Sequence, residues 1–136
     1  MQFHQNELFI YLDPNSSVGK KTRAYASSIS KNVNALDSNK IKLTATLWKE
    51  IVNMLNLRPK DLMNRAHPEY QEKIRGNTFT MTGWLEILAK NPQLLKAPIA
   101  IYHNKAIMCE RPTDILTLDE KSRRERKVLP HLKYYS

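Results

Sequence analysis

One segment near the start of the chain, residues 8–22, constrains the possible folds more than any other. Five apolar residues, Leu8–Leu12, lead into a short loop, Asp13–Ser17, and apolar residues at helical spacing follow at once. A short, uninterrupted apolar run before a turn is typical of a strand buried on both faces. A strand, a proline-containing loop and a helix in direct succession predict an α/β fold.

The rest of the chain continues this mixture of strands and helices. Asn32–Leu36 alternates weakly and is predicted to be a second strand, parallel to the first through a right-handed crossover. Two β-rich runs joined by residues 103–105 predict an antiparallel hairpin. The other expected elements are a helix from Thr44 or Thr46 to Leu55, a short helix Pro59–Arg65, a loop over 66–77, a helix Gly83–Lys90 and a helix from Arg111.

Length, composition and cysteine content limit the class of protein. At 136 residues, with 41% hydrophobic and 26% charged residues, the chain fits one globular domain. No apolar run reaches the roughly 20 residues of a membrane span, so we expect no membrane partner. The first residues lack the charged and apolar regions of a signal peptide, and the single cysteine cannot form an internal disulfide. We therefore expect a cytoplasmic protein.

Much of the net charge of +9 lies at the C-terminal end. Residues 120–136 hold six Lys or Arg and two Glu, which accounts for +4 of the total. We therefore divide the chain into a domain over residues 1–118 and a basic tail over residues 119–136. Because a basic tail is commonly a solvated element and charge alone names no partner, we do not expect direct nucleic-acid binding.

Several motifs resemble those of the arsenate reductase family, a branch of the thioredoxin fold. Asp13-Pro14-Asn15-Ser16 followed by Lys20 is similar to the family's active-site pattern, Asn-Pro-x-Cys-x-x-x-Arg. Three further matches follow in the family's order: Leu62–Arg65 loosely with Leu-x-Asn-x-Arg, Asn91–Ile99 with His-Pro-x-Leu-x-x-Arg-Pro-Ile, and Arg111-Pro112 with the Arg-Pro that opens the last helix. The resemblance spans residues 8–118 and implies a thioredoxin-like mixed four-stranded sheet with a helical insertion.

The resemblance also implies which residues would surround a bound oxyanion such as arsenate. In the family, arginines hold the oxyanion from the positions of Arg65, Ala97 and Arg111. The middle arginine is missing in this chain, and Lys96 beside it is a substitute that the sequence leaves open. Pro98 matches a family cis-proline whose segment faces the active-site loop.

A reactive cysteine occupies the position of Ser16 in the family. A helix N-terminus stabilises a thiolate and makes the sulfur nucleophilic, and thiols supply the two electrons of arsenate reduction by forming a disulfide. A serine hydroxyl cannot be oxidised in this way. No histidine with an acidic partner is identifiably placed to activate Ser16 as a nucleophile. The family's redox mechanism is therefore excluded at this position.

Cys109 is the alternative catalytic group. It lies two residues before Arg111, and strand alternation puts it on the sheet face of Ile107, so it is either a small buried hydrophobe or a lone reactive thiol. A lone thiol has no internal resolving partner, and this redox alternative would use a small thiol such as glutathione. We otherwise expect no cofactor, and the scattered histidines predict no metal site.

The loop before the first helix retains features of an anion site. Ser16, Ser17, the helix N-terminus and Lys20 suit an oxyanion, and Arg65 and Arg111 are further candidate ligands. Ser17 is equally suited to a simple helix N-cap.

Three functions stay open on these grounds. The leading hypothesis is a family member that has lost redox catalysis and keeps an anion- or protein-binding role. The first alternative is a thiol-dependent oxidoreductase, arsenate-reductase-like, that uses Cys109. The second is an Spx-like transcriptional regulator that contacts RNA polymerase.

Overall fold

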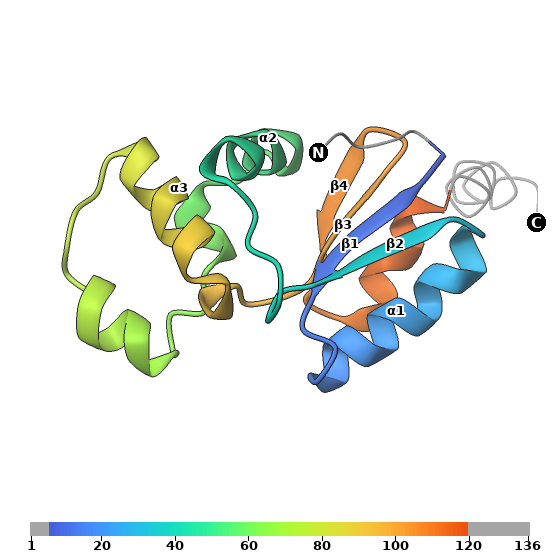
Figure 1. Ribbon diagram of the computed structural model, residues 1–136, viewed down its shortest axis with the longest axis horizontal. Coiled ribbons are helices and arrows are strands. Elements are labelled where there is room, and N and C mark those ends of the chain that lie inside the picture. The colour runs from blue at the N-terminus through green and yellow to red at the C-terminus, as the bar shows by residue number, and fades with distance from the viewer. Residues whose placement is uncertain (1–5, 120–136) are drawn as a thin grey trace, which may run out of the picture.

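Figure 1 shows the computed structural model, which describes residues 6–119. Residues 1–5 and the predicted basic tail, apart from Asp119, lie outside the described residues. None of the helices in residues 6–119 combines the length and the apolar character that a membrane crossing requires. The predicted α/β architecture is confirmed, because this part of the chain contains a mixed four-stranded sheet with helices and a helical insertion.

The sheet has the strand order β2-β1-β3-β4. β1 (Leu8–Leu12) pairs in parallel with β2 (Val33–Asp37), and helix α1 (Ser17–Ile29) is the crossover between them. On its other side β1 pairs antiparallel with β3 (Ile99–Tyr102), which forms a hairpin with β4 (Lys105–Met108). The predicted second strand and the predicted hairpin are therefore confirmed.

Alternate residues of β1 pack on opposite faces of the sheet. One buried cluster contains Leu8, Ile10 and Leu12 together with residues of α1 and of the 3₁₀ helix η4 (Pro112–Leu118). Phe9 and Tyr11 belong to a second cluster with the helical insertion. All five strand residues are at most 2% exposed, which explains the uninterrupted apolar run in the sequence.

The helical insertion lies between β2 and β3 (Figure 1). Its elements are α2 (Ala45–Leu55), the 3₁₀ helix η1 (Pro59–Leu62), the π-helical turn η2 (Tyr70–Ile74), α3 (Met81–Lys90) and the 3₁₀ helix η3 (Pro92–Leu94). One prediction was wrong, because the short helix ends at Leu62 rather than Arg65. The segment 66–77, expected to be mostly loop, also contains η2. This turn buries only Tyr70 and Ile74, a pair too short to give an amphipathic pattern.

A short backbone pairing fastens the insertion to the segment that precedes β3. Met63 and Leu95 form an isolated antiparallel bridge, and the Lys96 N–H donates to Leu62 O over 2.9 Å. This pairing joins positions more than thirty residues apart in the sequence. It places the residues that follow η1 beside the residues that enter β3.

The peptide bond before Pro98 is trans, since residues 6–119 contain no cis peptide bond. This corrects the cis-proline that the family resemblance implied. The trans form is the intrinsically favoured one for an X-Pro bond, by about 0.5–1 kcal/mol. Pro98 is buried, and its carbonyl oxygen accepts a hydrogen bond from the Cys109 N–H over 2.8 Å, which ties the entry of β3 to the end of β4.

Candidate functional site

Ser16 lies at the end of the loop between β1 and α1 and is the N-cap of the helix. Its oxygen accepts a hydrogen bond from the Gly19 N–H over 2.9 Å, and its hydroxyl donates to Asp13 O over 2.9 Å. Ser17, which the sequence suited equally to a cap or to an anion site, is the first helical residue and is exposed, because Ser16 has the extended backbone of a cap. The Ser16 hydroxyl is therefore committed to holding the loop on the helix.

Gly19 lets the loop pack directly against the first turn of α1. A Cβ atom at this position would lie 2.1 Å from the Asp13 carbonyl oxygen and 2.8 Å from Ser16 Oγ. Gly19 is buried, and no side chain fits between the helix and the loop backbone. The glycine therefore fixes where Asp13 and Ser16 lie relative to the helix.

A cavity of about 360 Å³ lies beside this loop. Its lining comes from the β1–α1 loop, the residues after β2, the insertion and the segment before β3. The polar side chains that line it include those of Asp13, Ser16, Asn39, His67 and Lys96. Asp13 and Lys96 are the two lining residues with a formal charge at pH 7, and they have opposite signs.

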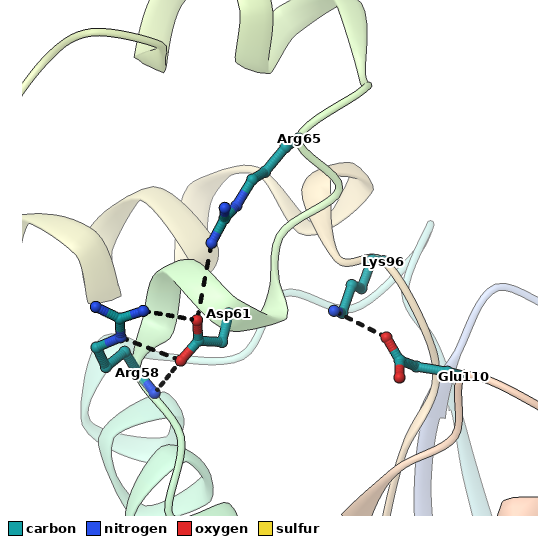
Figure 2. Close-up of polar contacts among 5 residues, drawn as sticks. All are labelled: Arg58, Asp61, Arg65, Lys96 and Glu110. Carbon is teal, nitrogen blue, oxygen red and sulfur yellow. Dashed lines mark hydrogen bonds and ion pairs between the residues drawn. The ribbon is translucent and has the colours of Figure 1, made fainter.

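A second hollow, of about 430 Å³, shares Lys96 with the first cavity and is also lined by Asp61, Asn64 and Arg65. Figure 2 shows Lys96 pointing toward Glu110 and Arg65 pointing toward Asp61. Lys96 Nζ lies 2.8 Å from Glu110 Oε1, whereas Arg65 Nη2 lies 3.8 Å from Asp61 Oδ1. Lys96 is thus the cation that links the two hollows.

Asp61 is held mainly by Arg58 rather than by Arg65 (Figure 2). The Arg58 backbone N–H and Nε donate to Asp61 Oδ2 over 3.0 Å and 3.3 Å, and Nη2 donates to Oδ1 over 3.2 Å. The side-chain hydrogen bond from Arg58 is the main reason that the pKa of Asp61 lies below its ordinary value. The Arg65 side chain is 56% exposed and only loosely engaged.

The arrangement of strands and helices matches solved structures of one group of proteins. An arsenate reductase from Vibrio cholerae superposes with a TM-score of 0.77 at 18% sequence identity, over 85% of this chain and 99% of that chain. The chain has the arsenate reductase fold. A Yersinia pestis protein provisionally described as an arsenate reductase matches with a TM-score of 0.73 at 23% identity, over 82% of this chain and 99% of that chain.

The resemblance that the motifs indicated is therefore confirmed at the level of the fold. An arsenate-reductase-related protein from Brucella melitensis also matches, with a TM-score of 0.57 at 19% identity over 79% of this chain and 89% of that chain. No family profile and no curated protein matches the chain. At these identities the likeness establishes the fold, and the chemistry has to be argued from the residues.

The five predicted anion-binding residues do not line one cavity in this chain. Ser16 lines the first cavity and Arg65 the second hollow, and the other three line neither. Lys20 is exposed on α1. The Arg111 side chain is 82% exposed and pairs with Asp114 at 3.4 Å, three residues along the chain. Arg111 is thus paired with a nearby acid, Asp114, and Arg65 lies beside Asp61, four residues earlier.

Lys96 and His67 were not among the predicted site residues. The sequence left Lys96 open as a substitute for the missing arginine, and Ala97, at that arginine's position, is buried in the cavity wall. His67 lies in a polar segment without periodicity, and its Nδ1 accepts the Glu69 N–H over 3.1 Å. In the neutral ring Nε2 then carries the proton. The two residues line the same cavity because the insertion pairs with the segment that precedes β3, and such long-range pairing leaves no signal in the sequence.

Cys109 is a buried structural residue. It is 0% exposed and packs in the cluster of Ile10, α1 and η4. Burial, with a smaller contribution from the charge of Asp114, raises the pKa of the thiol to about 12. Within residues 6–119 no group of His, Cys, Asp and Glu side chains is arranged to hold a metal ion.

Proposed function

We propose that this chain uses the arsenate reductase fold as a non-redox binding protein for a small anion. The proposal rests on the two hydrogen bonds of the Ser16 hydroxyl, which caps α1 and is bonded to the Asp13 carbonyl oxygen in the loop. A hydroxyl in this position supplies neither a thiolate nor an electron pair for reduction. The scaffold keeps a cavity at this position and lacks the nucleophile.

Cys109 does not favour the alternative of a thiol-dependent enzyme. A pKa of about 12 against an ordinary 9.0 lowers the thiolate fraction near neutral pH about a thousandfold. We therefore expect native protein to react with a thiol-specific disulfide reagent at least about a hundredfold more slowly than free glutathione, because burial adds to the pKa effect. Protein unfolded in denaturant should react at the rate of an ordinary cysteine.

The readout is the absorbance of the released reagent thiol, followed in parallel with arsenate reduction in the presence of glutathione. Rapid labelling of native Cys109, or reduction that disappears in Cys109→Ala, would restore the enzyme alternative. Absence of both would leave the binding role as the function to pursue.

Lys96 supports the choice of an anion as ligand. It lines both hollows, and its partner Glu110 is 60% exposed. Ion pairs this close to solvent contribute little, so a ligand anion can replace or join Glu110 at small cost. Arg65, which lies 3.8 Å from Asp61, is a second cation that lines the hollow of about 430 Å³ together with Lys96.

A titration with phosphate and with sulfate tests this function. We expect Lys96→Ala to weaken anion binding at least about tenfold, the value of one charge-assisted hydrogen bond. Lys90→Ala is the matched control, because Lys90 is also paired with a glutamate, at 3.6 Å, but lines neither hollow. Glu110→Gln should tighten binding about threefold by releasing Lys96.

Calorimetry and amide chemical shifts of the Ser16 and Lys96 regions give the affinities and the location. Equal losses in Lys96→Ala and Lys90→Ala would mean general charge attraction rather than a site. No binding of either anion by the wild type would reject the proposed function.

The other expectations from the sequence remain predictions. A protein partner, an Spx-like role with RNA polymerase, a role for glutathione and a cytoplasmic location rest on the family resemblance or on composition. The contacts of residues 6–119 add no specific support to any of them.

A further inference from the structure

Two opposite charges line the cavity beside Ser16 without pairing with each other. Lys96 forms its ion pair with Glu110, and Asp13 has no ion pair among the described residues. Opposite charges attract each other more strongly where water is excluded than in bulk water. Their separation leaves a space with an acidic side and a basic side.

The Asp13 carboxylate is held in a fixed orientation that leaves one oxygen open. Its Oδ1 accepts hydrogen bonds from the Asn15 N–H over 2.9 Å and from Asn39 Nδ2 over 2.8 Å. Its Oδ2 has no hydrogen-bond partner within residues 6–119. Asp13 is half-buried, and neutral donors hold it without neutralising its charge. An additional cation is the partner that this oxygen lacks.

The remaining lining suits the body of a small molecule between the two charges. Val18, Leu95 and Pro98 are apolar members of this lining, and His67 and Gln93 are polar ones. A cavity of about 360 Å³ is within the range of small-ligand sites, in which a few placed polar groups fix the orientation.

We propose that the ligand is a small ammonium carboxylate, with its carboxylate at Lys96 and its ammonium group at Asp13 Oδ2. The inference rests on the anion-binding function proposed above and adds a required positive charge to the ligand. The ligand completes the charge pairing that Asp13 and Lys96 do not make directly. A plain anion offers a partner to Lys96 alone and leaves the Asp13 charge unpaired.

Linear ω-amino acids of increasing length test the proposal, because their charges are a known number of bonds apart. The probes are glycine, γ-aminobutyrate and 6-aminohexanoate, each compared with the carboxylate and the amine of the same chain length. We expect one of the amino acids to bind at least about tenfold more tightly than both of its singly charged analogues. Calorimetry gives the affinities, and amide chemical shifts locate the site.

Asp13→Asn is the decisive variant, because asparagine keeps the Oδ1 acceptor for Asn15 and Asn39 and replaces the charged Oδ2 with a neutral NH2 donor. It should reduce the advantage of the amino acid over the carboxylate to within about twofold, while carboxylate binding is retained. Lys96→Met should remove the advantage over the amine. Thermal unfolding of both variants verifies that they fold.

The outcomes separate this inference from the proposed function. If the carboxylates or phosphate bind as tightly as every amino acid, the anion-binding function stands and the ammonium requirement is rejected. An unchanged preference in Asp13→Asn also rejects it. If no amino acid and no simple anion binds, both proposals fail.

Discussion

Replacing Gly19 with alanine is expected to lower the free energy of unfolding by about 2–3 kcal/mol, the cost of forcing a group into a closely packed site. The new Cβ would lie 2.1 Å from the Asp13 carbonyl oxygen, a backbone atom that moves only if the whole loop moves. The same shift disturbs the Ser16 cap and the orientation of Asp13. Urea unfolding followed by circular dichroism measures the loss.

Gly83→Ala is a matched control in the same protein. Gly83 stands three residues after the cap Thr80, as Gly19 stands three residues after Ser16, and its N–H donates to the Thr80 hydroxyl oxygen over 3.1 Å. A Cβ there would meet that oxygen at 3.3 Å, which requires a shift of only tenths of an ångström. The helix preference for alanine offsets about 0.5–1 kcal/mol.

The comparison isolates the loop contact from the general effect of alanine in a first helical turn. We expect Gly83→Ala to change the free energy of unfolding by no more than about 1 kcal/mol in either direction. Equal losses in the two variants would show that the loop does not press on Gly19. A tolerated Gly19→Ala, with unchanged Asp13 and Ser16 amide shifts, would contradict the described geometry of the loop.

The strands were predictable because their signals are local. The apolar run Leu8–Leu12 is buried by two different clusters on its two faces, so every one of its positions requires an apolar side chain. The hairpin β3–β4 turns at His103 and Asn104, both with positive φ, where the sequence had placed the turn. Local pattern and final fold agree at these places.

The site was less predictable because it depends on distant segments and on local competition. Asn39 reaches Asp13 across 26 residues, and Lys96 reaches the insertion through the bridge of Met63 with Leu95. No sequence pattern reports such contacts. Arg111 illustrates local competition. Its motif predicted a ligand for an anion, but its partner in the structure is Asp114, three residues later. Motif position alone therefore does not identify the partner of an arginine such as Arg111.

Alkaline pH is expected to destabilise the protein because two buried groups resist ionisation. Burial is the main cause that raises the pKa of Cys109 to about 12 from 9.0, and likewise that of Tyr11 to about 12 from 10.0, with the Asp37 charge a smaller cause at Tyr11. A raised pKa means that the folded state holds its proton after the unfolded state has lost it. The contribution of these two protonated groups to the free energy of unfolding is therefore fully present below about pH 9 and is lost as the pH rises toward 12.

Cys109→Ala separates the contribution of the thiol from that of the tyrosine. Between pH 8 and pH 11 the wild type should lose about 2–3 kcal/mol more unfolding free energy than this variant, because the unfolded thiol ionises over that interval while the folded one does not. The remaining fall belongs mainly to Tyr11, whose hydroxyl donates to Ile41 O over 2.5 Å and loses this bond on ionisation. Urea unfolding at each pH gives both curves.

Parallel curves for the wild type and Cys109→Ala would mean that Cys109 ionises in the folded protein as easily as in the unfolded chain. That result would place the thiol in contact with water and with reagents, and it would contradict its position in the cluster with Ile10 and Ile115. The alkaline experiment and the thiol-labelling experiment thus measure the same burial through two different properties, equilibrium stability and reaction rate. Agreement between them would show that the folded protein does not present Cys109 as a reactive thiol.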